Sequence, residues 1–507
     1  MAGTNRPRRT VKTNHSTLID AMEGKSSNIA YTENGAISNK TTKSALLDFF
    51  GMAGAVRNLN EHEIIDLFKK AYYESPILAM KMLFYFRDIR GGQGERRVFR
   101  ILINYLAHDI VMSNSIFMNF SQIPKMGRWD DFYSFFGTPL ESIAMEYMRE
   151  QLLEDVSIYN NRDKMEIPHI SLLAKWLKSE NTSSKESRRL ASKFRKFLKW
   201  SPRTYRTTLS DLRAYLNVVE RKMSSNRWGV IDYESVPSRA HFTYRKAFGR
   251  HDIEGYSAYL TSVKEGGKTI KATTLYPYDL VRKVLNNPKL DPTLDAQWRA
   301  LPNYVSEESN ALVIADTSGS MFTDDLLPIS TSVALALYFA ERNKGKFGGY
   351  FMTFSSTPKL IKIEGSTLQD KVQNISTANW AGSTNVQASF DLILETAMRE
   401  NISQSEMPSR IFIISDMEFN SCVRGYTNFE TIKNKYKNAG YEMPILIFWR
   451  VNSITTQHPI IFDEHGTMLV SGHSPSIFKN VMENKVCDPY NFMLEVLNQE
   501  RYMDIVV

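Results

Sequence analysis

Oxygen-bearing side chains follow an apolar segment at residues 316–320. The segment ALVIA at 311–315 is typical of a buried strand, and Asp316-Thr317-Ser318-Gly319-Ser320 comes directly after it. Carboxylate and hydroxyl oxygens are the ligands that hard divalent cations prefer in proteins. The same residue types also cap helices. This segment alone therefore leaves two interpretations open, a metal-binding loop and a helix N-cap.

Two further segments place hydroxyl or carboxylate groups where a strand or a loop ends. Thr384, in AGSTN, precedes a helical segment, and Asp416 follows the apolar segment IFIIS. Each segment alone favours helix capping, but the carboxyl ends of parallel strands meet at one edge of a sheet. Two carboxylates and three hydroxyls, with no histidine or cysteine, then predict a site for Mg²⁺ or Mn²⁺. An acidic side chain of a protein partner could fill the remaining position of the octahedron.

The elements that must position these groups alternate between strands and helices. Apolar segments at 311–315, 349–354, 411–415 and 444–449 are expected as buried strands, with helical segments between them. This alternation predicts a doubly wound, Rossmann-like α/β domain over residues 308–507. Its ligands would lie beyond the carboxyl ends of the strands, where Asp316 is expected.

The same order of residues resembles the metal-ion-dependent adhesion site of von Willebrand factor A domains. The family pattern is DxSxS, then Thr, then Asp, and all five positions match in this chain. The resemblance implies that four residues surround the metal: Asp316, Ser318, Ser320 and Thr384. It implies that Asp416 acts through water.

Residues 44–307 are predicted to be all-α. Ile64, Ile65, Phe68 and Tyr72 recur at the spacing of an amphipathic helix. Short helices joined by Pro, Gly or Ser turns predict stacked, HEAT-like helical hairpins, although no repeat is detectable in the sequence. Residues 1–43 are predicted to be a basic, mobile tail.

Positive charge is concentrated in the N-terminal part of the chain. Residues 308–507 carry 16 Lys and Arg against 22 Asp and Glu, and residues 1–307 carry 47 against 33. Arginines gather around a glycine turn in FRDIRGGQGERRVFR at 86–100, and residues 175–222 hold 14 basic against four acidic residues. This asymmetry favours a polyanionic partner for the N-terminal part over a merely solvated face. The aromatic residues of 175–222 are expected in the core rather than stacked on bases.

Several blocks resemble the TROVE-like helical family of Ro ribonucleoproteins, fused to a von Willebrand A domain. They include RDIRGGQGER, IPKMGRWDDF, KWLKSENTSS and PYDLV. The resemblance implies helical repeats closed into a ring, with single-stranded RNA ends in its hole and a structured noncoding RNA on its outer face. The RNA contacts that it implies are Arg87, Arg90, Arg96, Arg97, Lys125, Arg128, Lys175, Arg188 and Arg189.

Other classes of function find little support in the sequence. No apolar segment approaches the roughly 20 residues that span a bilayer, and the N-terminus has no apolar signal segment. Two cysteines make no disulfide framework, which favours a reducing, cytoplasmic compartment. Gly267-Lys268-Thr269 lacks the first glycine of a phosphate loop and a preceding strand. No catalytic constellation is recognisable, so we expect a non-enzyme that makes no membrane contact and has no DNA specificity.

The sequence therefore predicts an RNA-binding, Ro-like scaffold whose metal-bearing domain closes the ring or binds a partner. Two alternatives stay open. One is an RNA-free adaptor that binds an acidic partner through its metal, as von Willebrand A proteins do beside MoxR-type ATPases. The other is a viral structural or host-interaction protein.

Overall fold

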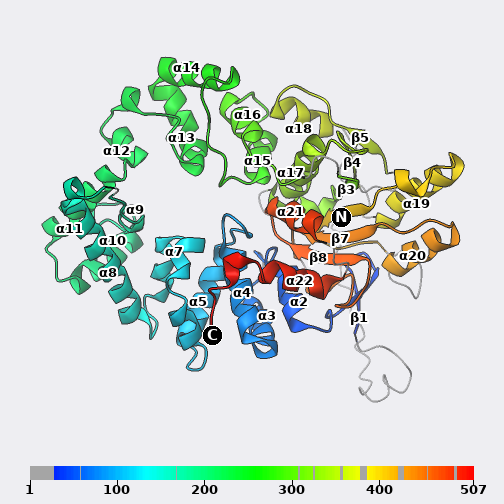
Figure 1. The fold of residues 1–507 in the computed structure, drawn as a ribbon, viewed down its shortest axis with the longest axis horizontal. Coiled ribbons are helices and arrows are strands. Elements are labelled where there is room, and N and C mark those ends of the chain that lie inside the picture. Colours follow the sequence, from blue (N-terminus) through cyan, green and yellow to red (C-terminus); the bar gives the residue numbers. More distant parts are fainter. Residues whose placement is uncertain are drawn as a thin grey trace, which may run out of the picture.

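The chain forms a ring of helices closed by an α/β domain (Figure 1). The computed structural model describes residues 28–57, 59–166, 168–305, 309–323, 326–353, 358–376, 385–420, 428–453, 455–484 and 488–507. Among these residues no helix is long and apolar enough to cross a membrane.

The helical array follows the chain around the ring. Its elements are α2 (Ala45–Met52), α3 (Glu61–Glu74), α4 (Pro76–Arg87), α5 (Arg97–His108), α6 (Ser113–Met118), α7 (Gln122–Met126), η1 (Trp129–Phe135), α8 (Glu141–Asn160), η2 (Arg162–Lys164), α9 (Leu173–Trp176), α10 (Lys185–Phe197), α11 (Pro202–Tyr215), α12 (Val219–Ser224), η3 (Trp228–Val230), α13 (Ser238–His251), α14 (Ile253–Lys264), α15 (Pro277–Asn286) and α16 (Pro292–Arg299). The prediction of an all-α region is confirmed.

Local chemistry sets where these helices begin. Asn60 accepts a bond from the Glu63 amide at 3.0 Å, and the Glu63 carboxylate accepts one from the Asn60 amide at 3.0 Å, which together cap α3. Pro76 stands in the first turn of α4, where its missing N–H costs nothing. The chain therefore breaks at Ser75 and starts a second helix.

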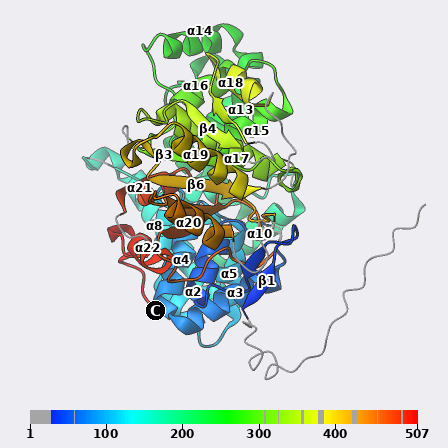
Figure 2. The same ribbon diagram turned by 90° about the vertical axis from the view of Figure 1, so that its right-hand side faces the viewer.

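The C-terminal domain is a doubly wound α/β sheet, as predicted. Its elements are β3 (Ala311–Ala315), η4 (Gly319–Met321), α17 (Leu327–Arg342), β4 (Tyr350–Thr353), β5 (Leu360–Lys362), α18 (Leu368–Ser376), α19 (Val386–Arg399), η6 (Gln404–Glu406), β6 (Arg410–Ser415), α20 (Asn428–Asn438), β7 (Ile445–Arg450), β8 (Thr467–Ser471), α21 (Ser476–Glu483), α22 (Pro489–Leu497) and η7 (Glu500–Tyr502). The strand order is β5-β4-β3-β6-β7-β8, and only β5 pairs antiparallel. Figure 2 shows α19 and α20 on the outward side of this domain.

The order of the strands reverses between β3 and β6. The chain leaves β3 to build β4 and β5 on one side, and β6, β7 and β8 on the other. β3 and β6 are parallel neighbours with Ala315 opposite Ile414. Their carboxyl ends therefore form the switch point at which ligands bind in open α/β sheets.

Two contacts close the ring. On one side α15 packs along α17, which also lies against β3 and β4. On the other side α2 packs on β8 and α22, and α22 packs on α4. Buried Asp88, at the end of α4, accepts bonds from Arg501 Nη2 at 2.8 Å and from the Tyr502 hydroxyl at 3.1 Å. The last residues of the chain thus hold the start of the helical array.

The prediction of a basic tail over 1–43 is wrong for residues 28–43. Residues 1–27 lie outside the described part, but β1 (Ile29–Tyr31) and β2 (Ile37–Asn39) form an antiparallel hairpin. The hairpin adds bridges from Gly35 to Asn420 and from Asn39 to His458. The buried Thr32 hydroxyl donates to the Phe419 carbonyl at 2.6 Å. This segment therefore belongs to the surface of the α/β domain.

The linker between the two parts is docked. Trp298 in α16 is buried, and its indole Nε1 donates to Glu341 Oε2 at 2.7 Å. The Tyr304 amide donates to the Tyr338 hydroxyl at 2.9 Å, and Arg342 Nη2 donates to the Trp298 carbonyl at 3.2 Å. These bonds tie the linker to α17, and its two prolines without a Gly/Ser run favour such a stiff, docked connection.

We predict that Trp298→Ala undocks this linker. Removing a buried indole should lower the free energy of unfolding in urea by about 3–5 kcal/mol. Limited proteolysis should then cut first between 291 and 305, a segment that stays resistant in the unchanged protein. Trp228→Ala, which removes a partly exposed indole stacked on His251, should leave that segment resistant. Early cleavage of the unchanged protein at 291–305 would contradict the docked arrangement.

Candidate functional site

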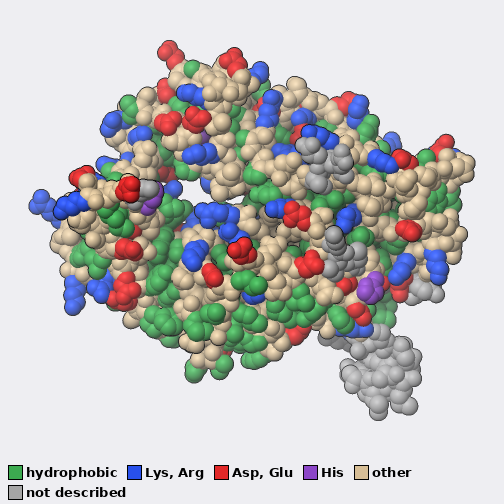
Figure 3. Space-filling model, in the orientation of Figure 1, with side chains coloured by type: hydrophobic (Ala, Val, Ile, Leu, Met, Phe, Trp, Pro, Cys, Tyr) green, Lys and Arg blue, Asp and Glu red, His purple; other side chains and the backbone are tan. Residues whose placement is uncertain are grey.

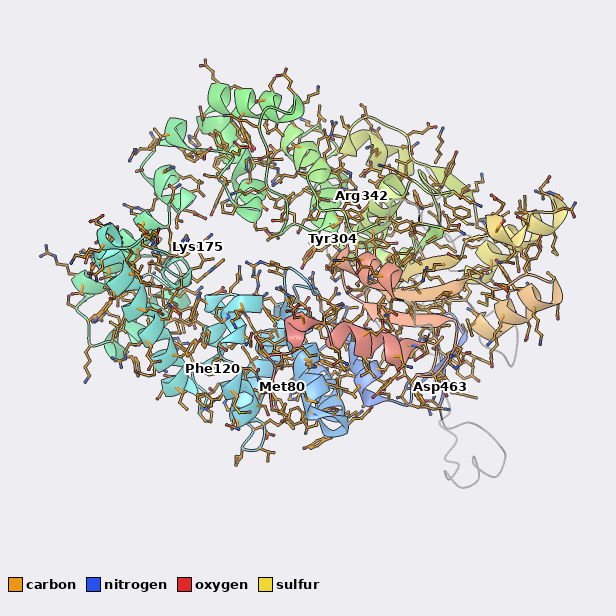
Figure 4. The ribbon with its side chains drawn as sticks, in the orientation of Figure 1. Met80, Phe120, Lys175, Tyr304, Arg342 and Asp463 are labelled. Carbon is orange, nitrogen blue, oxygen red and sulfur yellow. The ribbon has the colours of Figure 1, made fainter. Side chains whose placement is uncertain are left out.

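A large basic cavity lies at the middle of the ring. Its volume is about 1790 Å³, and Figure 3 shows the surface hollowed there, with Lys and Arg side chains along its margin. In Figure 4, Lys175 of α9 and Tyr304 of the linker lie on opposite sides of this opening. Twelve Lys and Arg residues line it: Arg57, Arg90, Arg96, Arg97, Arg100, Arg128, Lys175, Arg213, Arg221, Lys222, Arg227 and Arg239. The acidic lining residues are Glu95, Glu220 and Asp279.

Part of this charge is neutralised within the wall. Arg57 pairs with Glu95 at 2.8 Å, and Arg239 pairs with Asp279 at 2.6 Å. Arg213 instead donates Nε to the Ala174 carbonyl at 2.8 Å. Such groups fix the wall and have less capacity left for a ligand.

Five cations of the wall have no ion pair and no side-chain hydrogen bond to any residue that the structure describes. They are Arg96, Arg97, Lys175, Lys222 and Arg227. They come from the start of α5, from α9 and from the α12 region; α9 and α12 are neighbours on one side of the opening, and α5 lies on another side (Figure 1). Two sides of the cavity thus present unpaired positive charge.

Near η1, burial disfavours the charged form of the guanidinium groups. Burial, together with the nearby guanidinium groups of Arg96 and Arg87, lowers the pKa of Arg128 to about 10 against the opposing effect of Asp130. Arg128 also lies 4.2 Å from the centre of the Trp176 ring, which is one of the aromatic rings of the wall. An anion in the cavity would relieve the mutual repulsion of these cations.

The structure separates the RNA contacts implied by the resemblance into three groups. Arg90, Arg96, Arg97, Arg128 and Lys175 line the cavity. Lys125, Arg188 and Arg189 are exposed but are not part of the cavity wall.

Arg87 is not a surface contact, which corrects the expectation from sequence. Its side chain is buried, and Nε and Nη2 lie 2.8 and 2.7 Å from Oδ2 of the equally buried Asp131. Asp131 also accepts a bond from the Arg128 amide at 3.0 Å. Because a buried guanidinium needs a fixed partner, Arg87 joins α4 to η1 instead of facing solvent.

Several wall residues could not be predicted from the sequence. Arg57, Arg227 and Arg239 lie outside the two basic segments singled out above, and only the curvature of the array brings them to one cavity. Of the aromatic residues in 175–222, Phe194 and Tyr205 are in the core as expected, whereas Trp176 lines the cavity.

A second candidate site lies at the switch point of the sheet. Asp316 follows β3, Asp416 follows β6, and the Asp316 amide donates to the Ile414 carbonyl at 2.9 Å. The Ser415 hydroxyl lies 2.5 Å from Asp316 Oδ2 and 3.5 Å from Asp416 Oδ1. Both carboxylates are buried. Parallel pairing of β3 with β6 has therefore brought two acidic groups, 100 residues apart in sequence, to one point.

The two serines of the loop lie beside these carboxylates. The Ser318 amide donates to Asp316 Oδ1 at 2.9 Å, and the Ser318 and Ser320 hydroxyls are 3.1 Å apart. The Ser320 hydroxyl also lowers the pKa of Asp416, although burial raises it on balance. Thr384, the fifth residue of the pattern, lies outside the described residues.

The chemistry of this group of residues fits a hard divalent cation. Burial and the neighbouring Asp416 carboxylate both raise the pKa of Asp316. Asp416 Oδ2 is buried without a hydrogen-bond partner among the described atoms. The described part of the chain holds no cluster of three or more His, Cys, Asp or Glu that could bind a metal, so the group has two carboxylates and relies on hydroxyls for its other oxygens. Asp316, Ser318, Ser320 and Asp416 could hold Mg²⁺ or Mn²⁺ through oxygen alone.

The chain matches two families that are described as domains of unknown function. The family DUF2828 matches residues 32–109 and 177–311, and the family DUF7788 matches residues 310–503. The uncharacterized protein L728 of Acanthamoeba polyphaga mimivirus is 30% identical over 506 residues, which cover 93% of this chain and 87% of that protein. The crystal structure of the Deinococcus radiodurans RO (RSR) protein is similar over 91% of this chain and 100% of that one, with 12% identity and a TM-score of 0.43.

We predict that Arg87 is needed for stability. Arg87→Met leaves the Asp131 carboxylate buried without its main partner, so the free energy of unfolding should fall by about 3–5 kcal/mol. Arg189→Met removes an equal charge from an exposed pair with Glu186 and should leave the urea midpoint unchanged. Equal midpoints for the two variants would show that the Arg87–Asp131 pair does not support the fold.

Proposed function

The chain belongs to the family of the mimivirus protein L728, and from its cavity we propose that it is an RNA-binding scaffold whose ring encloses single-stranded RNA. The observation that carries this proposal is the set of unpaired cations on two sides of one cavity. A cavity of about 1790 Å³ exceeds the roughly 300–1,000 Å³ typical of small-molecule pockets. A polymer with repeated negative charge would fill this volume and neutralise the unpaired cations of the wall.

Single-stranded RNA suits the wall better than a merely acidic protein does. Basic grooves that bind single strands combine cations for the backbone with aromatic faces for the bases. The wall offers both, since Trp176 and Tyr244 lie among its arginines and lysines. The resemblance of the sequence blocks quoted above to Ro ribonucleoproteins likewise implies single-stranded RNA in the hole of the ring. The protein would act by binding alone, with no catalytic step, in the cytoplasm.

The α/β domain has a separate role in this proposal. Asp316, Ser318, Ser320 and Asp416, with Thr384, would hold Mg²⁺ or Mn²⁺ in the manner of a von Willebrand A domain. The cation would supply an open coordination position for an acidic side chain of a protein partner. Support comes from the two adjoining buried carboxylates and the unpartnered Asp416 Oδ2. An RNA-free adaptor built on this metal site is the alternative that the RNA measurements below decide.

We predict that the affinity for a hydroxyl-ended single-stranded RNA depends on Arg97 and Lys222. Each neutralised phosphate contributes about −0.7 to the slope of log affinity against log salt, so Arg97→Gln with Lys222→Gln should reduce the slope by about 1.4. The loss should be similar for all base sequences, because a backbone contact reads no base. Fluorescence anisotropy at several salt concentrations measures both quantities.

The matched control removes two cations outside the cavity. Arg188→Gln with Arg189→Gln should leave the affinity and the slope unchanged, since neither residue lines the wall. An equal loss of affinity in this control would indicate that the RNA binds on the outer surface of the ring. Absence of RNA binding at low salt would favour the adaptor.

We predict that Asp316→Asn abolishes Mn²⁺ binding in a calorimetric titration. The variant should keep its circular dichroism, because burial already opposes the charge of this carboxylate. Asp463→Asn is the control. This exposed carboxylate lies three residues before Gly466, whose carbonyl accepts a bond from the Leu446 amide near the start of β7. It therefore lies near the amino ends of the strands, whereas Asp316 lies at their carboxyl ends. Undiminished Mn²⁺ binding by Asp316→Asn would contradict the assignment of this metal site.

A further inference from the structure

A group of charged residues at the cavity wall and directly behind it carries more positive charge than its own carboxylates neutralise. We call it the arginine cluster: Arg87, Arg96, Arg100 and Arg128, together with Asp130 and Asp131. It joins the end of α4, the start of α5 and η1. The cluster holds four guanidinium groups and two carboxylates, which gives it a net charge of about +2.

The two carboxylates are fully engaged within the cluster. Asp131 binds Arg87 at 2.7 Å and Arg100 at 2.7 Å, and Asp130 binds Arg100 at 2.9 Å and Arg128 at 3.0 Å. Arg96 has neither an ion pair nor a hydrogen bond from its side chain to any described residue. Its guanidinium lines the cavity beside Arg97. The surplus charge therefore sits where a ligand can reach it.

The neighbours of Arg96 do not compensate it. Burial, and then the guanidinium groups of Arg87 and Arg100, lower the pKa of Arg96, against the weaker effect of Asp130 and Asp131. Glu95 is already committed, since it pairs with Arg57 and accepts a bond from the Arg97 amide at 2.9 Å. The wall thus carries electrostatic repulsion that a bound anion would remove.

A further cation and an aromatic ring adjoin the cluster. Arg128 lies over the Trp176 ring at 4.2 Å, and Lys175 Nζ lies 5.5 Å from the centre of the same ring. Lys175 also lines the cavity and has no ion pair within the described residues. An anion held by Arg96 would therefore have Arg128 and Lys175 as further positive neighbours.

We propose that the arginine cluster binds the terminal phosphate monoester of a single-stranded RNA, so that the cavity selects strand ends over internal segments. This inference rests on the proposed function. A phosphate monoester carries about −1.5 to −2 at pH 7, which matches the surplus of the cluster, whereas an internal phosphodiester carries one charge. A guanidinium fork also binds phosphate oxygens two at a time.

The test compares one 12-nucleotide RNA with a 5′-phosphate, with a 3′-phosphate and with hydroxyls at both ends, by anisotropy on the full chain. A charge-assisted contact should make one phosphate-ended form bind roughly tenfold tighter than the hydroxyl form. The form that gains affinity identifies which end the cluster holds. Equal affinity of all three forms would overturn the proposal.

Variants assign the preference to the cluster. Arg96→Gln should abolish the preference, so that the three forms bind this variant with equal affinity. Arg96→Lys, which keeps the charge and loses the fork, should retain part of the preference. Lys222→Gln, across the cavity, should weaken all three forms by the same factor. Retention of the full preference in Arg96→Gln would overturn the assignment.

A titration with uridine 5′- and 3′-monophosphate separates the two proposals. If no oligonucleotide binds, the proposed function fails, and the calorimetric titration decides the cluster alone. Heat from a monophosphate but not from uridine, lost in Arg96→Gln, supports the phosphate subsite. Absence of heat from both monophosphates overturns it.

Discussion

The burial of α17 is the constraint on which the rest of the structure depends. This helix is apolar or small on every side, and its residues from Leu327 to Ala340 are all buried. One side covers β3 and β4, and another receives α15 of the helical array. Because neither neighbour alone could shield it from water, the sheet and the array fold as one body. The same helix begins just after the loop of residues 316–320 and ends at the docked linker, so it helps to position both candidate sites.

Charge divides the arginines of the array into two kinds. Arg87 and Asp131 are both buried, and the ion pair between them stabilises each of them there. Arg96 lies nine residues further along and has no such partner. The ion pairs inside the array engage the available carboxylates, and the arginines and lysines without an ion pair line the cavity. The basic character of the ring is thus a result of how few acidic residues reach its inner wall.

Sequence reasoning succeeded where the signal was local. ALVIA and IFIIS are buried strands flanked by helices, so the adjacency of Asp316 and Asp416 could be predicted from the topology of a parallel sheet. It failed where burial depends on distant contacts. Arg87 and Arg90 stand in one basic segment, and no spacing rule says that a carboxylate at 131 buries the first. The hairpin of β1 and β2 was predicted as a polar tail because its partners, Asn420 and His458, follow Gly35 and Asn39 by 385 and 419 residues. The short β5 was not predicted, because it is an exposed edge strand without an apolar run.

The closed circuit of elements around the cavity has a topological consequence. From α2 to α16 the chain passes once round the cavity, and the contacts of α15 with α17 and of α2 with β8 complete the loop. A polymer inside such a loop is retained by linkage as well as by attraction. It can leave only by sliding out end first or when one of the two closing contacts separates. Residence time would then grow with the length of polymer on either side, and a covalently circular polymer could enter only while the circuit is open.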